Sequence, residues 1–303
     1  MAQFLATLLP DAKRLHLQLG PIDLIIGAQG LQADIDAAYG QARQAFDGLL
    51  EQLVSELAVL KSPVSKHNLK TTGPVANRMV EAANHFKGQF VTPMAAVAGA
   101  VADYILASMT AGRSLEKAYV NNGGDIALYL SGGAQHRVGI VADVHNPKIN
   151  MTTTITYDHP VRGVASSGWR GRSHSLGIAD AVTVLACSAA QADVAATLIA
   201  NAVDPGPCAQ VTREPAQDLS PDSDLAELLV TVNVTNLSND QIERALARGQ
   251  HLALDYVERG LIAGVALSLS GRVVSVGEVL TQAKTISPEF INLASKEAVH
   301  APS

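Results

Sequence analysis

Four short stretches of the sequence combine side chains whose types and spacing could bind a small molecule. In the first, Asn122 precedes two glycines, Gly123 and Gly124, and Asp125 follows them. Adjacent glycines allow the backbone to turn tightly and to approach a ligand closely. An ordinary hairpin turn has the same composition, so the stretch fits either a binding turn or a structural one.

The second stretch is a polar loop that carries hydroxyl, guanidinium and imidazole groups. Arg170 and Arg172 could each bond to phosphate oxygens through the guanidinium fork. Trp169, the single tryptophan, could stack on a ring or anchor the loop. A solvated basic loop is the alternative interpretation. The candidate residues of this loop are Ser166, Ser167, Gly168, Arg170, Arg172 and His174.

The third group, Asp193 and Thr197, is spaced four residues apart on a predicted helix that follows an apolar strand. This spacing places a carboxylate and a hydroxyl on one helix face, one turn apart. Hard oxygen ligands of this kind suit Mg²⁺, which completes its shell with water and phosphate oxygens. The same pair also occurs on ordinary helix surfaces, so the spacing alone leaves both interpretations open.

The fourth stretch, Met94–Asp103, is rich in alanine and contains Gly99. A glycine inside a helix costs about 1 kcal/mol relative to alanine. Its presence predicts that another group approaches the helix closely at that point. That group is either a ligand or a tightly packed neighbour.

Composition places these stretches in a globular protein with a large core. Of the 303 residues, 48% are hydrophobic and 17% are charged, and the formal net charge is −6. The acidic balance disfavours a nucleic-acid partner, since such partners require a basic surface. Two cysteines are too few for a disulfide framework, and such a low cysteine content is typical of proteins from the reducing cytosol. The sequence contains neither the P-loop nor the Rossmann glycine pattern.

The sequence predicts a cytoplasmic protein without a membrane partner. No basic region precedes the first apolar stretch, in contrast to a signal peptide. The most apolar segment, Met94–Met109, contains Asp103 and falls short of the roughly 20 residues that a membrane span requires. We therefore expect a buried helix there.

Local patterns predict the elements that position the four stretches. Apolar residues at helical spacing predict one long helix over 33–60, and further helices from Pro74 and over 94–109, 190–203 and 240–260, the last capped by Asn239. Strands are predicted over 15–20, 23–28, 136–144, 150–159, 163–168 and 181–187, and hairpins over 118–133 and 264–277. Residues 213–224 are predicted to form a surface loop, and a strand is expected in the second half of 225–237.

Strands and helices do not alternate strictly along the chain. This order favours an α+β fold with a mainly antiparallel sheet over a parallel, doubly wound one. We expect a single domain over 1–280, followed by a tail over 281–303.

Taken together and in order, the four stretches resemble the ApbE superfamily, whose characterised enzymes are FAD:protein FMN transferases. The closest likeness is to a short ApbE-like branch. It rests on the segments TPMAAVAGAVAD, NNGGDIAL and SSGWRGRSHSLGIADAVTV and covers roughly residues 20 to 280. The resemblance implies a T-fold-like architecture of two related antiparallel-sheet halves with packed helices and a cleft between them.

The resemblance also implies roles for individual residues. Asp193 and Thr197 match the metal ligands of the family, and the backbone carbonyl of Val97 would be a third ligand of Mg²⁺. His174 matches a histidine that precedes the metal region and is the candidate catalytic residue. The segments that would contact FAD contain Gly99, Asn122, Gly123, Gly124, Asp125, Ser166, Ser167, Gly168, Arg170 and Arg172.

One segment departs from the transferase pattern. Transferases carry a lysine near the phosphates, and Ala98 stands at that position here. Loss of a cation beside developing phosphate charge slows such chemistry by orders of magnitude. The departure therefore favours a relative that keeps the fold without full transferase activity.

Three functions are compatible with the sequence. The favoured one is a Mg²⁺-assisted site for a flavin nucleotide or another small anion, in an accessory protein of redox or sulfur metabolism. The second is an active FMN transferase or FAD hydrolase, with a protein as substrate in the case of transfer. The third is a protein-interaction module whose pocket is vestigial.

Overall fold

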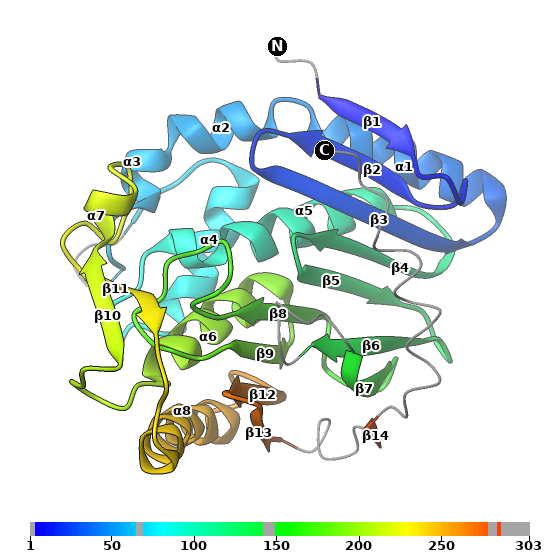
Figure 1. The fold of residues 1–303 in the computed structure, drawn as a ribbon. Helices are drawn as coiled ribbons and strands as arrows, with labels where there is room; N and C mark the ends of the chain where they lie inside the picture. Colours follow the sequence, from blue (N-terminus) through cyan, green and yellow to red (C-terminus); the bar gives the residue numbers. More distant parts are fainter. Residues whose placement is uncertain (1–3, 65–68, 142–148, 278–283, 286–303) are drawn as a thin grey trace.

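Nine strands form one continuous antiparallel sheet in the computed structural model of the chain, which describes residues 4–64, 69–141, 149–277 and 284–285. The strand order is β1-β2-β3-β4-β5-β8-β9-β12-β13 (Figure 1). The strands are β1 (Leu5–Leu8), β2 (Leu15–Leu19), β3 (Ile22–Gly30), β4 (Leu115–Asn122), β5 (Asp125–Leu130), β8 (Gly163–Ser167), β9 (Ala181–Ala186), β12 (Gly264–Leu269) and β13 (Arg272–Val276).

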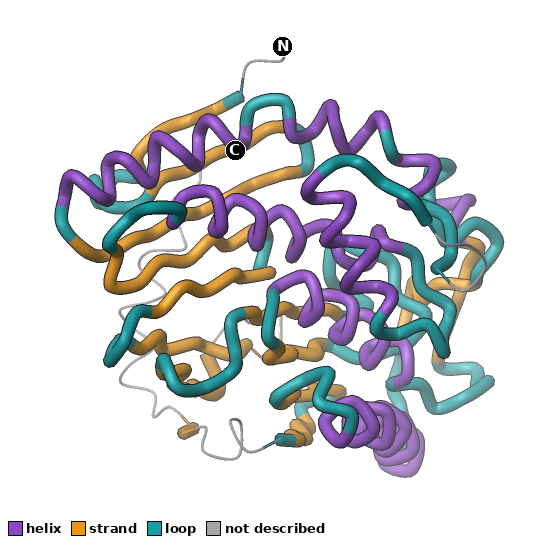
Figure 2. The backbone as a smooth tube through the Cα atoms, turned by 180° about the vertical axis from the view of Figure 1, so that it is seen from behind, coloured by secondary structure: helices purple, strands orange, loops and turns teal. Residues whose placement is uncertain are grey.

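Helices cover one face of this sheet (Figure 2). α1 and α5 pack on the strands from β2 to β5, and α6 and α8 pack on those from β8 to β13. Their apolar faces and the facing strand residues form the main core. The helices are α1 (Gln32–Phe46), α2 (Leu49–Ser55), α3 (Leu57–Leu60), α4 (Pro74–Asn84), the 3-10 helix η1 (Pro93–Ala96), α5 (Val97–Thr110), α6 (Ala189–Ala202), α7 (Ala216–Leu219) and α8 (Asn239–Glu258).

A smaller sheet of β6 (Gln135–Val141), β7 (Ile149–Thr156) and β14 (Lys284–Thr285) contributes to a second core on the other face. Successive strand residues point to opposite faces. Ala127 of β5 therefore joins the main core, whereas Leu128 contacts the second core together with Ile155 of β7. β10 (Val211–Pro215) and β11 (Leu229–Val234) form a separate hairpin that also holds α7.

The predicted α+β class is confirmed. The strands of the large sheet are antiparallel, and its two portions, β2–β5 and β8–β13, carry their own helices. They join where β5 pairs with β8 through Ile126 opposite Val164 and Ala127 opposite Gly163. The division into a domain over 1–280 and a tail over 281–303 stays a prediction, and residues 286–303 lie outside the described part of the chain.

Three local predictions are wrong. The single helix over 33–60 is three helices, because Gly48 adopts a left-handed φ of 72° and redirects the chain after α1. Residues 213–224 are not only a surface loop, since they include part of β10 and all of α7. The cap of α8 is Ser238 instead of Asn239, and Ser238 forms a capping box with Gln241.

The apolar segment predicted as a buried helix is η1 and α5. In the part of the chain that the structure describes, Pro93–Thr110 alone is long and apolar enough to cross a membrane, by length and composition. A core helix of a globular protein passes the same test. In the fold α5 packs between α1, α4 and α6, and it contacts β4 and β5.

Candidate functional site

The β4–β5 turn is tied to the beginning of α5. The Asn122 side chain is buried and donates from Nδ2 to the carbonyl oxygen of Ala98 over 3.1 Å. Gly123 and Gly124 have φ values of 65° and 117°, a region that strongly favours glycine. The sequence therefore predicted this turn correctly, and the turn lies against the N-terminal end of a helix.

Two aspartates on contacting elements, β5 and α6, lie near this turn. Asp125 is buried at the start of β5, and its Oδ1 accepts a hydrogen bond of 3.2 Å from the backbone N–H of Ser166 on β8. Asp193 on α6 accepts at Oδ2 from the backbone N–H of Gly99, over 3.0 Å. The charge of Asp125 acts on Asp193, so the two groups form one electrostatic unit. Neither forms an ion pair with another described residue.

Helices α5 and α6 cap each other through their aspartates. Asp193 of α6 accepts from the free N–H of Gly99 in the first turn of α5. In return, Asp103 of α5 accepts at its two oxygens from the N–H groups of Ala189 and Ala190, at 3.0 and 2.8 Å. Carboxylates at helix N-termini satisfy unpaired donors and interact favourably with the helix dipole. Sequence reasoning found Asp193 but assigned no role of this kind to Asp103.

Burial makes all three carboxyl groups harder to ionise. It raises the pKa of Asp125 to about 7 and that of Asp103 to about 6. Burial and the neighbouring Asp125 charge raise the pKa of Asp193 well above its ordinary value, against the backbone N–H groups of Gly99 and Ala98, which favour the charged form. Such a pair suits a divalent cation, which would compensate both charges at once.

Gly99 is required by the contact between the two helices. A Cβ atom at this position would lie 2.3 Å from the carbonyl oxygen of Ala189. The neighbour is therefore packed protein backbone, which accounts for a glycine in this helix, and contact of Gly99 with FAD stays a prediction.

We expect Gly99→Ala to destabilise the protein by about 1–3 kcal/mol, the typical cost of overpacking a core. Chemical denaturation measures this loss. The matched control is Gly40→Ala on the exposed side of α1, where nothing lies within 4 Å of the new Cβ. There alanine should stabilise the helix by up to about 1 kcal/mol. Equal effects at the two positions would contradict the packing argument.

The polar loop after β8 lies next to the same turn. Ser166 bonds through Oγ to Thr183 Oγ1 of β9 at 2.9 Å, a partner hidden within a run of apolar residues in the sequence. Arg172 Nη1 would lie 3.6 Å from a Cβ on Gly123, so this guanidinium reaches the glycine turn. Arg170 is instead paired with Asp180 at 3.1 Å and lies over the Trp169 ring.

A family model described as "AbpE bacteria" matches residues 6–275. The chain belongs to that family. The match confirms the resemblance to the ApbE superfamily that the motifs indicated. It includes the β4–β5 turn, the loop after β8 and both capping aspartates.

The AbpE-type chain also resembles archaeal proteins whose names state no activity. A UPF0280 protein of Methanothrix thermoacetophila is 40% identical over 136 residues, 44% of this chain and 53% of that protein. A UPF0280 protein of Methanosarcina barkeri is 33% identical over 193 residues, 63% of this chain and 73% of its own length. The match thus spans about half of the first relative and nearly three quarters of the second.

A solved structure of a mutant of the flavin transferase ApbE from Vibrio cholerae is 14% identical and aligns over 88% of this chain and 97% of its own. Its TM-score is 0.47.

The remaining predicted residues of this AbpE-family chain lie on α5, on α6 and in the loop between β8 and β9. Thr197 follows Asp193 by one turn of α6, and Val97 begins α5 beside Ala98. His174 is directed elsewhere, since its Nε2 lies 3.3 Å from Ser220 Oγ at the end of α7. The catalytic role of His174 and the metal-ligand roles of Val97 and Thr197 stay predictions.

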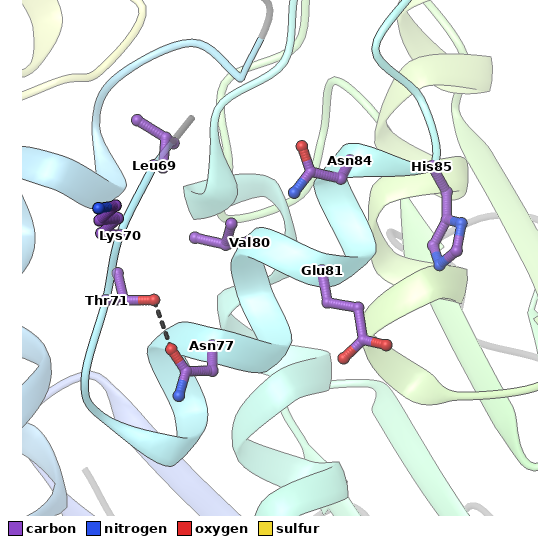
Figure 3. Close-up of a pocket in the computed structure, with 8 residues that line it drawn as sticks. All are labelled: Leu69, Lys70, Thr71, Asn77, Val80, Glu81, Asn84 and His85. Carbon is purple, nitrogen blue, oxygen red and sulfur yellow. Dashed lines mark hydrogen bonds between the residues drawn. The ribbon is translucent and has the colours of Figure 1, made fainter. Parts of the chain in front are cut away.

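A hollow of about 550 Å³ lies on the exposed side of α4, between that helix and the preceding segment (Figure 3). Thr71 Oγ1 donates to Asn77 Oδ1 at 2.7 Å across its edge. Lys70, Glu81 and His85 also line it. None of the predicted site residues belongs to this hollow, so it is separate from the carboxyl pair.

Proposed function

We propose that this chain binds a flavin nucleotide or a related small anion with the help of Mg²⁺, and that it does not carry out full FMN transfer. The observation that supports this most is the Asp125–Asp193 pair. One buried and one half-buried carboxyl group with no ion pair among the described residues are costly to hold in their charged forms. A bound divalent cation would remove that cost.

The donor set fits a hard cation. Asp193 accepts at Oδ2 from the N–H of Gly99, and the N–H of Ala98 also interacts with this carboxyl group. A carboxylate has about four lone-pair sites on its two oxygens, so it can bind a cation as well. Asp193, Thr197 and the carbonyl of Val97 would hold Mg²⁺, and Asp125 would supply negative charge beside it. When bound, the cation would neutralise charge on the phosphate oxygens of the ligand.

Protein groups for the phosphates lie at the glycine turn. Arg172 is exposed, reaches Gly123, and has no ion pair with another described residue. Arginine binds phosphate through its planar fork. Arg170 is engaged by Asp180 and is the weaker candidate.

Binding is favoured over transfer because Ala98 stands where the resemblance to the transferases would place a lysine. Ala98 is in the first turn of α5, directly beside Gly99 and the carboxyl pair. No described cation takes the place of that lysine next to Asp125 or Asp193. We further propose that the protein serves an accessory role in redox or sulfur metabolism.

The test is a titration of the purified, ligand-stripped protein with FAD, with and without Mg²⁺, followed by flavin fluorescence. We expect Mg²⁺ to strengthen binding and no AMP to be released. Asp193→Asn keeps an oxygen that can accept from Gly99 but removes the charge. We expect it to weaken Mg²⁺-dependent binding at least about tenfold, which is ~1.4 kcal/mol.

The matched control is Asp255→Asn, an exposed carboxylate on α8 that is paired with Arg259. It should leave FAD binding unchanged. An FAD affinity that changes neither with Mg²⁺ nor with Asp193→Asn would contradict the proposed site. Mg²⁺-dependent AMP release by the wild-type chain would instead establish the transferase or hydrolase alternative.

A further inference from the structure

A large cavity lies beside the first half of β4, whereas the glycine turn near the carboxyl pair follows the other end of this strand. Its volume is about 1070 Å³, at the upper end of the usual range for small-molecule sites. The turn between β1 and β2, the end of β3, the start of α1 and the first residues of β4 and β6 surround it. Figure 1 shows this end of the molecule, where β1 turns into β2 and β3 leads into α1.

The cavity and the carboxyl pair are separated along β4. The cavity is lined by 116–119 in the first half of this strand, whereas Asn122 and the glycine turn lie at its end. Tyr119 and Asn122 are three residues apart on β4, which is about 10 Å along the strand. None of the residues that line the cavity belongs to the proposed Mg²⁺ site.

Two tyrosines lie at the cavity wall. Tyr119 is paired with Gly27 in the sheet register, and a Cβ on Gly27 would lie only 2.4 Å from a ring carbon of Tyr119. The absence of a side chain at Gly27 therefore lets the Tyr119 ring lie over the neighbouring strand. Tyr39 of α1 is buried behind the wall, and its hydroxyl donates to the carbonyl oxygen of Lys13 at 2.6 Å. The partly exposed ring of Tyr119 is the one suited to stack on a flat ring.

The cavity lining carries an excess of positive charge in a chain whose net charge is negative. Five cationic side chains and three carboxylates contribute to it, an excess of two. Arg14 is paired with Asp11, and Lys117 Nζ donates to the carbonyl oxygen of Gln135 at 3.1 Å. Arg43 and Arg137 form no ion pair with another described residue. The five cations are Lys13, Arg14, Arg43, Lys117 and Arg137.

We propose that this cavity is a second ligand site, which binds a small molecule with a flat heterocyclic ring and a phosphate group. The Tyr119 ring would contact the ring of the ligand, and Arg43 and Lys117 would neutralise its phosphate. Such a site is independent of Mg²⁺ and of the carboxyl pair.

The test measures binding of ADP by calorimetry in the presence of EDTA, and compares it with binding of adenosine and of pyrophosphate. ADP should bind more tightly than either half, since it engages both the Tyr119 ring and the cations. The double variant Arg43→Ala/Lys117→Ala should weaken ADP binding by about tenfold or more. Arg259→Ala, which removes an exposed cation of α8, and Asp193→Asn should leave it unchanged.

Gly27→Ala supplies an independent test that removes no charge. The new Cβ can be accommodated only if the Tyr119 ring moves away from the strand, which should lower ADP affinity while the protein stays folded. A photoreactive 8-azido-ADP provides a measurement that requires no variant. Labelling should fall on peptides that contain Tyr39 or Tyr119.

Three results would overturn the proposal. One is the absence of ADP binding by the wild-type chain. Another is binding that the cavity variants leave unchanged and that Asp193→Asn abolishes, which would place the ligand at the carboxyl pair. The last is labelling confined to peptides outside the cavity. The first and last leave the proposed FAD site untouched, because that site is tested with Mg²⁺ and FAD.

Discussion

The metal-free protein should lose stability as the pH rises from about 4 to about 7. The ordinary pKa of an aspartate is 3.8, whereas the folded values are about 7 for Asp125 and about 6 for Asp103, and that of Asp193 is also raised. In this window the folded state holds protons that the unfolded state has already released. Each proton retained lowers the free energy of unfolding as the pH increases.

The expected size of this effect is large. One unit of pKa shift corresponds to about 1.4 kcal/mol, so the three groups together should cost several kcal/mol above pH ~7. Typical domains have only about 5–15 kcal/mol of stability in total. Denaturant unfolding at a series of pH values, in the presence of EDTA, measures the loss.

Two comparisons isolate the carboxyl pair. Asp125→Asn, which preserves size and an acceptor oxygen for Ser166, should flatten the pH dependence. Its stability should exceed that of the wild type at the alkaline end. Mg²⁺ should raise the stability of the wild type there and leave the variant less affected. His136, whose pKa is lowered by burial, contributes a slope of the opposite sign in both proteins and cancels in the comparison.

A wild-type protein whose stability is flat or rising from about pH 4 to about pH 7 would contradict this argument. So would a variant with the same slope as the wild type. In either case the carboxyl groups would be charged in the fold without cost, and the main support for a cation at this position would disappear.

Local sequence signals predicted the elements whose geometry is set by neighbouring residues. Asn122 and the two glycines specify a tight turn by their own backbone preferences, and the structure has that turn. Pro74 starts α4 for the same kind of reason, because its fixed φ and missing N–H suit a first helical turn. These predictions needed no knowledge of distant residues.

The site depends on contacts between residues that are far apart in the chain, and there the sequence was less informative. Asp103 and Ala189 are 86 positions apart, and Gly99 and Asp193 are 94 apart. Helical spacing indicated that Asp193 and Thr197 share a face, but not that Asp193 caps α5. His174 contacts Ser220 because α7 folds over the loop, and residues 213–224 gave no signal for α7.

Ala98→Lys should produce Mg²⁺-dependent release of AMP from FAD at about a hundred times the background rate or more, the scale of a lost phosphate-stabilising group. The reason is electrostatic. Position 98 lies in the first turn of α5, next to the Asp193 cap, and the residue is partly exposed, so a long side chain has room to extend. A lysine there would supply a cation beside the proposed phosphate site. Chromatographic quantification of AMP, with Mg²⁺ and with EDTA, measures the gain.

The matched control is Ala98→Met, which has comparable length and no charge. It should leave AMP release at the wild-type level, since packing alone supplies no stabilisation of phosphate charge. A lysine variant that binds FAD as the wild type does and still releases no AMP would show that position 98 does not limit the chemistry. The barrier would then lie in groups such as His174, which the fold directs towards Ser220 and away from the carboxyl pair. AMP release by the lysine variant would show that one missing cation limits the chemistry. Its absence would show that the site differs from the transferases more widely.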